Sequence, residues 1–475
     1  MNWEQILWLT GGAVFLRLFG RGRLRLWGLL VASVFVVFWL QPPLPIRGLD
    51  FWMPMATIGL ACVGWALTAP RPLLSWRHDL WAGTVILLET GVLLGVQSLL
   101  PVGAILPSDP PQIMLVLIGC LLGATLIYII LRADNYRPIL IWSALAILIL
   151  CLVVLKNPGL LQMTASGLRM LVGQSATLAQ STDIRWLGFS YLAFRLIHTL
   201  RDRQNGRLMN ASLAEYLIYM VFFPALAAGP IDRMERFLKD LRSETGMGAA
   251  DFIEGGKRII LGMVMKFVLA DSLALAALNP ENALQVRSPG WAWGMLYAYS
   301  LQIYFDFAGY THIAIGIGRI LAIHLPENFR QPYLKPNLTQ FWNNWHISLT
   351  QWFRAYFFNP FTRWLRTRKP AIPATLILLL SQSATMVLIG LWHGISWNFL
   401  IWGLWHGLGL FLQNRWSDWS KNIAPAWIQK KNVAVLLKAA SVGLTFHYVA
   451  LGWLWFVLPE PAGALRFFLC LLGRG

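Results

Sequence analysis

Long apolar segments separated by short polar loops run through most of this chain. A segment of about 20 apolar residues is long enough to cross the hydrocarbon core of a bilayer as a helix. The pattern predicts an all-α polytopic membrane protein with about 11–13 membrane helices, plus re-entrant or interfacial helices. The predicted crossings are 5–20, 26–41, 49–69, 80–100, 112–131, 138–155, 184–200, 257–279, 291–321, 372–391, 396–413 and 434–457.

Three segments do not have the pattern of a simple crossing. Residues 156–183 are weakly apolar and are expected to form an external loop or an interfacial helix. Residues 213–230 are apolar but have basic residues on both sides, and their two prolines, Pro224 and Pro230, terminate helix. We expect this segment to enter the membrane and return, or to lie along its face. Residues 338–360 are aromatic and polar, also between basic flanks, and are expected to be a second re-entrant element.

The basic residues of the loops predict the topology. They are concentrated after the first, third and fifth crossings, whereas the loop 101–111 has no base and one acid. Because cytoplasmic loops carry an excess of Lys and Arg, this bias predicts an N-terminus outside the cell and 101–111 on the outer side. The chain is therefore expected in the cell membrane as a multi-pass protein.

Composition supports a membrane protein and excludes a soluble one. Of 475 residues, 57% are hydrophobic and 13% are charged, and the mean hydropathy is +0.56, whereas soluble proteins carry about 25% charged residues. The net charge of +18 lies in short loops, so it indicates membrane topology and not a nucleic-acid partner. Cys62, Cys120, Cys151 and Cys470 lie in or beside apolar segments, which is typical of buried thiols and not of disulfides or metal ligands.

Two histidines, His393 and His406, are the only ionisable residues in the apolar stretch 385–412. An ionisable group at membrane depth is costly, so it suggests a functional site. Histidine also titrates near neutrality and can accept a proton and then return it. One interpretation is that His393 is a general base. The other is that both histidines hydrogen-bond backbone carbonyls between packed helices.

The spacing of the two histidines separates their roles. On one continuous helix, 13 residues place them about 140° apart and roughly 20 Å apart along the axis, so they do not share a site. Gly394, Ser396 and Asn398 make a helix break near His393 plausible, and broken helices at membrane depth line cavities. His393 is thus the better catalytic candidate and His406 the better structural one.

Four ordered segments stand out, 219–233, 302–316, 341–352 and 391–407, the last of which begins Leu-Trp-His-Gly-Ile-Ser-Trp-Asn. These segments resemble the motifs of the membrane-bound O-acyltransferase family. The resemblance is greatest to the bacterial branch of alginate O-acetyltransferases and teichoic acid D-alanyl transferases. The resemblance covers about 180–457 and predicts a catalytic core there, after motif-free membrane helices at 1–160 and before a short tail at 458–475.

The resemblance implies roles for individual residues. His393 matches the family's catalytic histidine and His346 its second polar active-site position. The resemblance also implies a ring of helices around a central tunnel, with donor and acceptor entering from opposite sides. The predicted substrate-binding residues are Asp306, Trp342, Trp392, Trp397 and Asn398. Asp306 requires a polar partner inside its crossing, and for it a structural role is favoured over a binding role.

The predicted activity is direct transfer of an acyl group, expected to be acetyl, to a hydroxyl of an exported polysaccharide or cell-envelope glycan. The donor is expected to be a cytoplasmic thioester, either acetyl-CoA or an acyl carrier protein, with no bound cofactor and no metal. A periplasmic or extracellular partner acyltransferase is a further possible partner, beside membrane lipid. Two alternatives remain open: D-alanyl-type transfer from a carrier protein, and a transporter or flippase that uses the histidines as a proton relay.

The sequence departs from the branch at four positions. Asn343 and Asn344 stand where the branch usually has basic residues, Ala355 and His312 where it usually has Asp. These differences concern the donor more than the reaction type.

Overall fold

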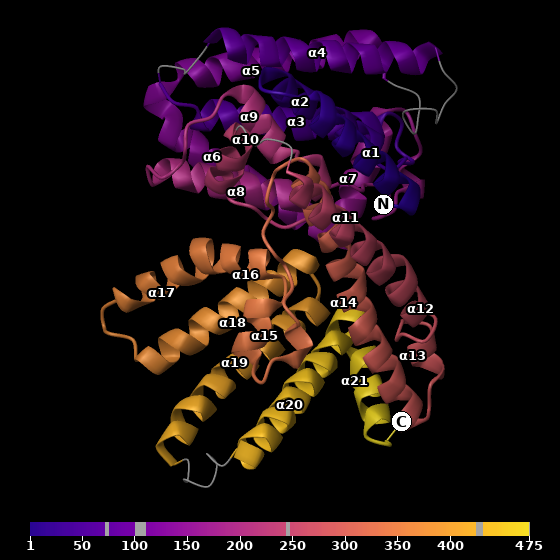
Figure 1. The fold of residues 1–475 in the computed structure, drawn as a ribbon, viewed down its shortest axis with the longest axis vertical. Helices are drawn as coiled ribbons and strands as arrows, with labels where there is room; N and C mark the ends of the chain where they lie inside the picture. Colours follow the sequence, from indigo (N-terminus) through magenta and orange to yellow (C-terminus); the bar gives the residue numbers. More distant parts are fainter. Residues whose placement is uncertain (72–75, 100–110, 244–247, 424–430, 475) are drawn as a thin grey trace. The chain divides into compact units, whose positions relative to one another are not determined.

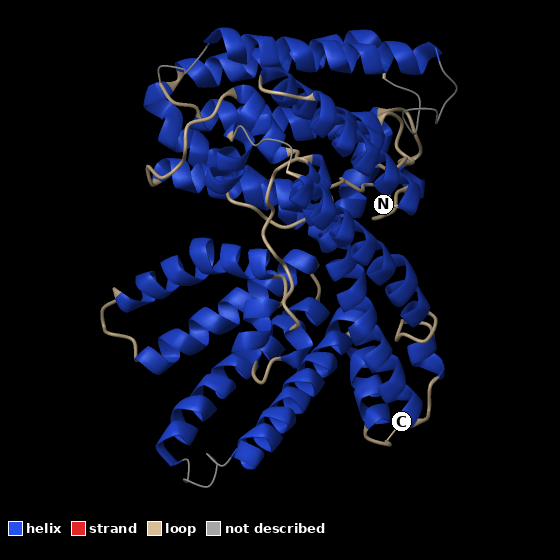
Figure 2. Ribbon diagram, viewed as in Figure 1, coloured by secondary structure: helices blue, strands red, loops and turns tan. Residues whose placement is uncertain are grey.

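The computed structural model describes residues 1–475 except 72–75, 100–110, 244–247, 424–430 and 475 (Figure 1). Over these described residues the regular secondary structure is helical and contains no strand (Figure 2). The all-α prediction is therefore confirmed. Most of the loop 101–111, predicted to lie outside the cell, falls beyond the described residues.

Among the described residues, six helices are long and apolar enough to cross a membrane. They are Leu49–Thr68, Arg77–Val96, Ile113–Arg132, Asp134–Lys156, Ala374–His393 and Asn432–Val457. All six coincide with predicted crossings, and the chain is a multi-pass membrane protein. The other predicted crossings are shorter or less apolar helices, so their passage through the bilayer stays a prediction.

The described chain divides into two compact units, Met1–Ile260 with His312–Pro326, and Leu261–Thr311 with Glu327–Gly475. The first unit contains α1 (Trp3–Phe19), α2 (Arg23–Trp39), α3 (Leu49–Thr68), α4 (Trp76–Leu99), α5 (Ile113–Arg132), α6 (Arg137–Lys156), α7 (Pro158–Leu171), α8 (Phe189–Gln204), α9 (Leu213–Met220), α10 (Met234–Arg242) and most of α11 (Ala249–Met263). The boundaries predicted at 160, 180 and 457 stay a prediction.

A buried arginine in the first unit explains why 213–230 is not one long helix. The helix α9 ends at Met220, and a 3-10 turn containing Pro224 follows. Arg195 of α8 is buried, and its Nη1 donates to the carbonyl oxygens of Tyr219 at 3.1 Å and Met220 at 2.8 Å. It satisfies carbonyls that the helix end leaves without partners. An interrupted backbone suits the predicted re-entrant segment, whose depth in the bilayer stays a prediction.

Between α6 and α8 the chain forms a helix and not only a loop. The Oδ1 of Asn157 accepts from the backbone N–H of Leu160 at 3.0 Å and so caps α7. Arg169 near the end of α7 forms a buried ion pair with Asp183, with 2.7 Å between Nε and Oδ2. The first half of 156–183 is therefore helical, and its location at the membrane interface stays a prediction.

The second unit contains the π-helical turn η4 (Val264–Ala270) and the helices that carry the sequence motifs. These are α12 (Asp271–Ala274), α13 (Asn282–Gln285), the part of α14 (Pro289–Ile320) up to Thr311, α15 (Leu338–Asn344), α16 (Ile347–Phe353), the π-helical turn η6 (Arg354–Phe358), α17 (Asn359–Arg366), α18 (Ala374–His393), α19 (Trp397–Ile423), α20 (Lys431–Val457) and α21 (Pro461–Leu471).

The segment 338–360 is broken, as expected for a re-entrant element. The helix α15 stops at Asn344, and α16 begins at Ile347 after two non-helical residues. The next long helices, α18 and α19, lie side by side as a hairpin (Figure 1). This arrangement places His346 and His393 each at an interruption between two helices.

Candidate active site

His393 is the last residue of α18, where the helix stops. Gly394 follows with an extended backbone, and α19 begins at Trp397, so the predicted break next to His393 is confirmed. Close packing of α18 against α19 requires glycine: a Cβ added to Gly403 would lie 2.5 Å from the Cα of Val387. The hairpin therefore holds the interruption, and with it His393, in a fixed position.

Aromatic rings surround the His393 imidazole. Its centroid lies 4.5 Å from that of Trp392, 4.9 Å from Phe456, 5.9 Å from Trp402 and 6.0 Å from Phe399. The residue itself is only partly buried. A histidine that is walled by apolar rings but still reachable suits proton transfer better than a fully enclosed one.

His406 differs from His393 in every respect that bears on access. It lies about 14 Å along α19 from the break and has no exposed surface. Its ring packs edge-on against Trp342 at 5.1 Å and against Trp402 at 4.9 Å. Trp402 also contacts His393, so this indole lies against both imidazoles. This packing suits a structural residue, but both ring nitrogens of His406 are buried without a hydrogen-bond partner among the described residues, so the expected bonds to backbone carbonyls are not formed.

His346 has a left-handed backbone with φ of 43°, which is unusual for a residue other than glycine. It precedes α16, and its side chain is buried. The ring meets Phe307 edge-on at 4.7 Å and Trp392 at 6.4 Å. Since Trp392 also contacts His393, the two histidines named from the sequence lie around one indole.

Asn328 holds the backbone next to His346. Its carbonyl oxygen accepts from the N–H of Ile347 at 3.0 Å, and its Oδ1 accepts from the N–H and the hydroxyl of Ser348 at 3.1 and 2.6 Å. The side chain of Asn328 is fully buried. Asn328 was not selected from the sequence, because its partners lie about 20 residues away and leave no local pattern.

Asp306 forms an ion pair with Lys266 of the π-helical turn η4. The side chain of Asp306 remains 52% exposed. Lys266 supplies the polar partner that the sequence predicts for Asp306. The neighbouring residue, Phe307, is the one that reaches the His346 ring. This geometry fits the structural role favoured for Asp306 and gives no contact between its carboxylate and either histidine.

The other predicted binding residues divide into two groups. Trp342 and Trp392 belong to the ring cluster around the histidines. Trp397 is 73% exposed, at the first turn of α19. Asn398 is buried, and its Nδ2 donates to the carbonyl oxygen of Leu458 just after α20. Asn398 therefore joins two helices, and its side-chain nitrogen is already engaged.

A pocket of about 160 Å³ with both polar and apolar walls opens beside Trp342, between α15, the α16–η6 segment, α18 and α19. Its polar lining includes Thr339, Asn343, Thr350, Arg354, Gln382 and Thr385. Arg354 donates from Nη2 to the Oδ1 of Asn343 at 2.6 Å. Asn343 is one of the positions where the sequence departs from the related bacterial branch, which usually has a basic residue there. The one arginine that lines this pocket is therefore hydrogen-bonded to a neutral amide.

No group of three or more metal-ligating side chains that could hold an ion is found in the described part of the chain. The four thiols are all free, on α3, α5, α6 and α21. None of these helices contributes a ring to the His393 cluster.

The fold and these two helix interruptions define a polytopic membrane protein with a histidine site set among aromatic rings. Residues 134–450 match the MBOAT, membrane-bound O-acyltransferase, family, and the chain belongs to this family. The resemblance noted from the four motifs is thereby confirmed.

The chain is similar to two groups of bacterial relatives. It is 32% identical over 273 residues to the teichoic acid D-alanyltransferase of Bacillus subtilis (strain 168), covering 57% of this chain and 68% of that protein. It is 34% identical over 290 residues to the probable alginate O-acetylase AlgI of Pseudomonas aeruginosa, covering 61% of this chain and 52% of that protein. The chain thus spans about half the length of the alginate relative.

Proposed function

We propose that this protein transfers an acyl group directly from a cytoplasmic thioester to a hydroxyl of an exported cell-envelope glycan, with His393 as general base. The observation that carries the proposal is the position of His393 at the interruption between α18 and α19, around the same indole as His346. Family membership supports acyl transfer over the alternative of a histidine proton relay in a transporter.

The reaction needs a base for the acceptor hydroxyl. The imidazole of His393 takes the hydroxyl proton as the oxygen attacks the thioester carbonyl carbon, which forms a C–O bond and a tetrahedral oxyanion. The C–S bond then breaks, and the imidazolium returns its proton to the departing thiolate. The net products are an ester and a free thiol.

His346 is the candidate for a hydrogen bond to the substrate. Both of its ring nitrogens are buried and have no hydrogen-bond partner among the described residues. A buried unpaired polar atom is costly, so a substrate oxygen that accepts from this ring gains more than it would in water. We assign His346 to orienting the acceptor or stabilising the oxyanion.

Direct transfer is favoured over an acyl-enzyme because no thiol lies in the cluster. Of the four free cysteines, Cys62 and Cys470 are buried on α3 and α21. Ser396 is the hydroxyl nearest in sequence to His393, and its oxygen accepts from the backbone N–H of Phe399 at 3.4 Å. Ser396 immediately precedes α19, which is the position of a helix cap.

Two candidates remain for the acyl group and for the carrier that delivers it. Acetyl transfer follows the names of the alginate relatives, and D-alanyl-type transfer from a carrier protein follows those of the teichoic acid relatives. A periplasmic or extracellular acyltransferase is a candidate partner that completes delivery to the glycan. We favour acetyl transfer and keep aminoacyl transfer as the second candidate.

Basic residues around the His346 stretch suit an acidic donor. They are Arg330, Lys335, Arg354, Arg363, Arg366, Arg368 and Lys369. The last four are exposed on or just after α17, and Arg368 stacks on Trp364 at 3.8 Å from its centroid. Coenzyme A and acyl carrier proteins are negatively charged, so this basic rim raises their local concentration.

Mass spectrometry of envelope glycans tests the proposal. Cells that lack the gene are compared with cells that regain the parent or His393→Ala at equal membrane abundance. We expect an ester-linked acyl group on the glycan with the parent only, and its mass distinguishes acetyl from aminoacyl. Full acylation with His393→Ala contradicts the role of His393, and unchanged glycans in all strains contradict the activity.

A further inference from the structure

An apolar groove of about 850 Å³ runs between α1 and α2 in the first unit, away from both histidines in sequence. Its lining includes Gly12, Phe15, Leu16, Trp27, Gly28 and Val31, and buried Phe223 contributes to it as well. On α2 the lining extends from Trp27 to Trp39, about 18 Å at 1.5 Å per residue. One leaflet of the hydrocarbon core is about 15 Å deep, so the groove has the length of one lipid chain.

Gly12 leaves open space in the wall that α1 contributes to the groove. A Cβ added to Gly12 meets no atom within 4 Å, so the space beside this residue is open. Exposed rings, Trp8 and Phe15 with 74% and 61% of their surface accessible, stand along the same helix. A glycine notch between aromatic side chains suits a flexible chain of methylene groups better than a flat protein surface.

The groove leads to a turn that is rich in arginine. Leu16 and Trp27 line its end, and the turn between them carries Arg21 and Arg23, both exposed. Neither guanidinium forms a hydrogen bond or ion pair with any residue that the structure describes.

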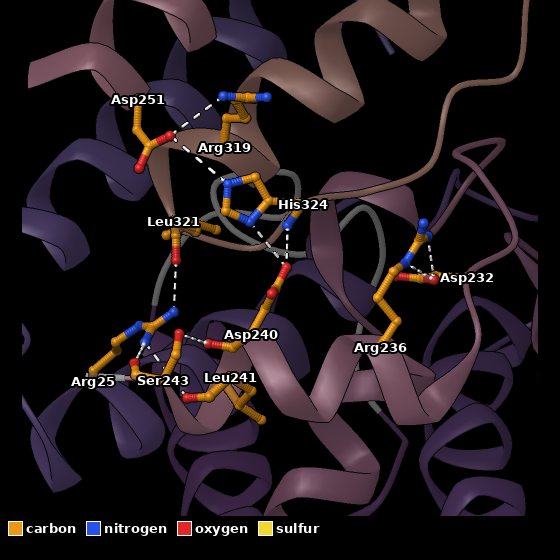
Figure 3. A network of polar contacts seen from close by, with 10 residues as sticks. All are labelled: Arg25, Asp232, Arg236, Asp240, Leu241, Ser243, Asp251, Arg319, Leu321 and His324. Atoms are coloured by element: carbon orange, nitrogen blue, oxygen red, sulfur yellow. Dashed lines mark hydrogen bonds and ion pairs between the residues drawn. The ribbon is translucent and has the colours of Figure 1, made fainter. Parts of the chain in front are cut away.

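Arg25, in the first turn of α2, already donates hydrogen bonds within the protein. Its Nη2 donates to the carbonyl oxygen of Leu321 at 2.8 Å and its Nη1 to that of Ser243 at 3.2 Å (Figure 3). Arg25 therefore holds α2 against the rest of the first unit. Arg21 and Arg23 remain as cations at the mouth of an apolar groove.

We propose that the groove between α1 and α2 binds one anionic glycerophospholipid, with an acyl chain in the groove and the phosphate on Arg21 and Arg23. The chain is held by burial of its methylene groups against Gly12, Phe15 and Val31. The phosphate is held by the two guanidinium groups, which bind phosphate with parallel N–H···O bonds. The site thus recognises the charge of the headgroup and the length of the chain together.

Lipid retention on the purified, delipidated protein tests the chain site, with phosphatidylglycerol as probe and native mass spectrometry as readout. Gly12→Leu fills the groove, and Gly11→Leu is the matched control, because an added Cβ there also meets nothing within 4 Å but Gly11 does not line the groove. We expect Gly12→Leu to lower retention by about tenfold, and Gly11→Leu to leave it within about twofold. Val31→Phe is a second filling variant should Gly12→Leu not insert.

Headgroup recognition is tested with phosphatidylcholine as the zwitterionic probe. Arg21→Gln with Arg23→Gln should weaken phosphatidylglycerol retention on the order of tenfold and leave phosphatidylcholine unchanged, whereas the two Lys substitutions keep most of the preference. Three outcomes overturn the proposal: equal retention by Gly12→Leu and Gly11→Leu, equal retention of the two lipids by the parent, or crosslinking that shows a second copy of the chain seated on the groove.

Discussion

The Oδ1 atom of Asn328 accepts two hydrogen bonds from Ser348, one from the backbone N–H at 3.1 Å and one from the hydroxyl at 2.6 Å. These bonds fix the first turn of α16 immediately after His346. The left-handed backbone of His346 is a conformation that persists only where its surroundings enforce it. Asn328 is therefore a positioning residue for the His346 ring, without touching that ring itself.

Removal of this clamp should affect both stability and turnover. Asn328→Ala removes the side-chain oxygen that accepts from the buried N–H and hydroxyl of Ser348, at a cost of about 1–3 kcal/mol in the free energy of unfolding. Without these bonds the His346 ring is no longer held in one orientation, so kcat should also fall, by about tenfold or more per folded molecule. Thermal unfolding in detergent measures the first effect and acyl-transfer assays at equal folded protein the second.

Ser348→Ala is the matched comparison for Asn328→Ala. It removes the hydroxyl bond and keeps the backbone bond, so we expect a smaller loss of about 0.5–1.5 kcal/mol and near-parent kcat. If Asn328→Ala lowers the unfolding temperature but leaves kcat at the parent value, Asn328 supports the fold alone.

The sequence predicted the helix break beside His393 better than it predicted the contacts around His346. His393 stood out as a candidate because an ionisable residue in an apolar run is costly and because Gly394 follows it. Asn328 did not stand out, since its partners, Ile347 and Ser348, lie about 20 residues away and local pattern does not report which backbone groups a buried amide meets. Long apolar helices such as α5 and α18 follow directly from hydropathy.

Interrupted segments were harder to predict than long helices. The break in 213–230 was expected from Pro224 and basic flanks, but Arg195, the residue that satisfies the broken end, belongs to a different helix. Likewise, Lys266 as partner of Asp306 depends on how η4 packs against α14. Pairings between helices are set by tertiary packing, and a single sequence carries little information about them.

Substitution of the two intramembrane histidines should have opposite effects. His393→Ala removes the base, so we expect kcat to fall by about 10²–10⁴ with little change in unfolding temperature. His406→Ala leaves a cavity between Trp342 and Trp402, so it should lower the unfolding temperature and spare kcat per folded molecule. Parallel thermal and kinetic measurements separate the two. Equal kinetic losses in folded protein would reverse the assignment of His406.

Arg195 should be essential to the stability of the first unit. Arg195→Ala leaves the carbonyl oxygens of Tyr219 and Met220 without their donor, and we expect a loss of about 1–3 kcal/mol or more. Arg195→Lys should recover only part of this, because an ammonium lacks the planar fork that reaches several carbonyls. The exposed Arg207→Ala is the control. Equal unfolding temperatures for the Arg195 and Arg207 variants contradict the role of the clamp.

Accessibility labelling tests the topology. In a background without the four native cysteines, single cysteines in 201–212 and 322–337 should label from the cytoplasmic side. Cysteines in 414–432, of which 424–430 lie outside the described residues, should also label from the cytoplasmic side. Cysteines in 101–111 should label from the outer side. Labelling of 232–245 only from outside contradicts the re-entrant interpretation of 213–230, because α9 and the 3-10 turn Phe223–Ala225 would then be part of a full crossing.

The basic residues that follow α17 offer a kinetic test of the donor route. Neutralisation of Arg366, Arg368 and Lys369 together should raise the apparent KM for the thioester donor and flatten its dependence on salt, because exposed charges attract an acidic donor through a screened field. The acceptor KM should change little. The competing explanation is that these residues only enforce topology, since cytoplasmic loops are basic in any case.

The two explanations differ in correctly inserted protein. A topological role predicts altered cysteine labelling and unchanged donor kinetics in the molecules that insert correctly. A donor-binding role predicts parent-like labelling with a higher donor KM and a weaker salt effect. Exchange of the basic residue type at the same three positions, Lys for Arg and Arg for Lys, keeps the positive charge. The donor KM of this variant should equal that of the parent. If it does not, the interaction depends on the guanidinium geometry, as in the stacking of Arg368 on Trp364, and not on net charge.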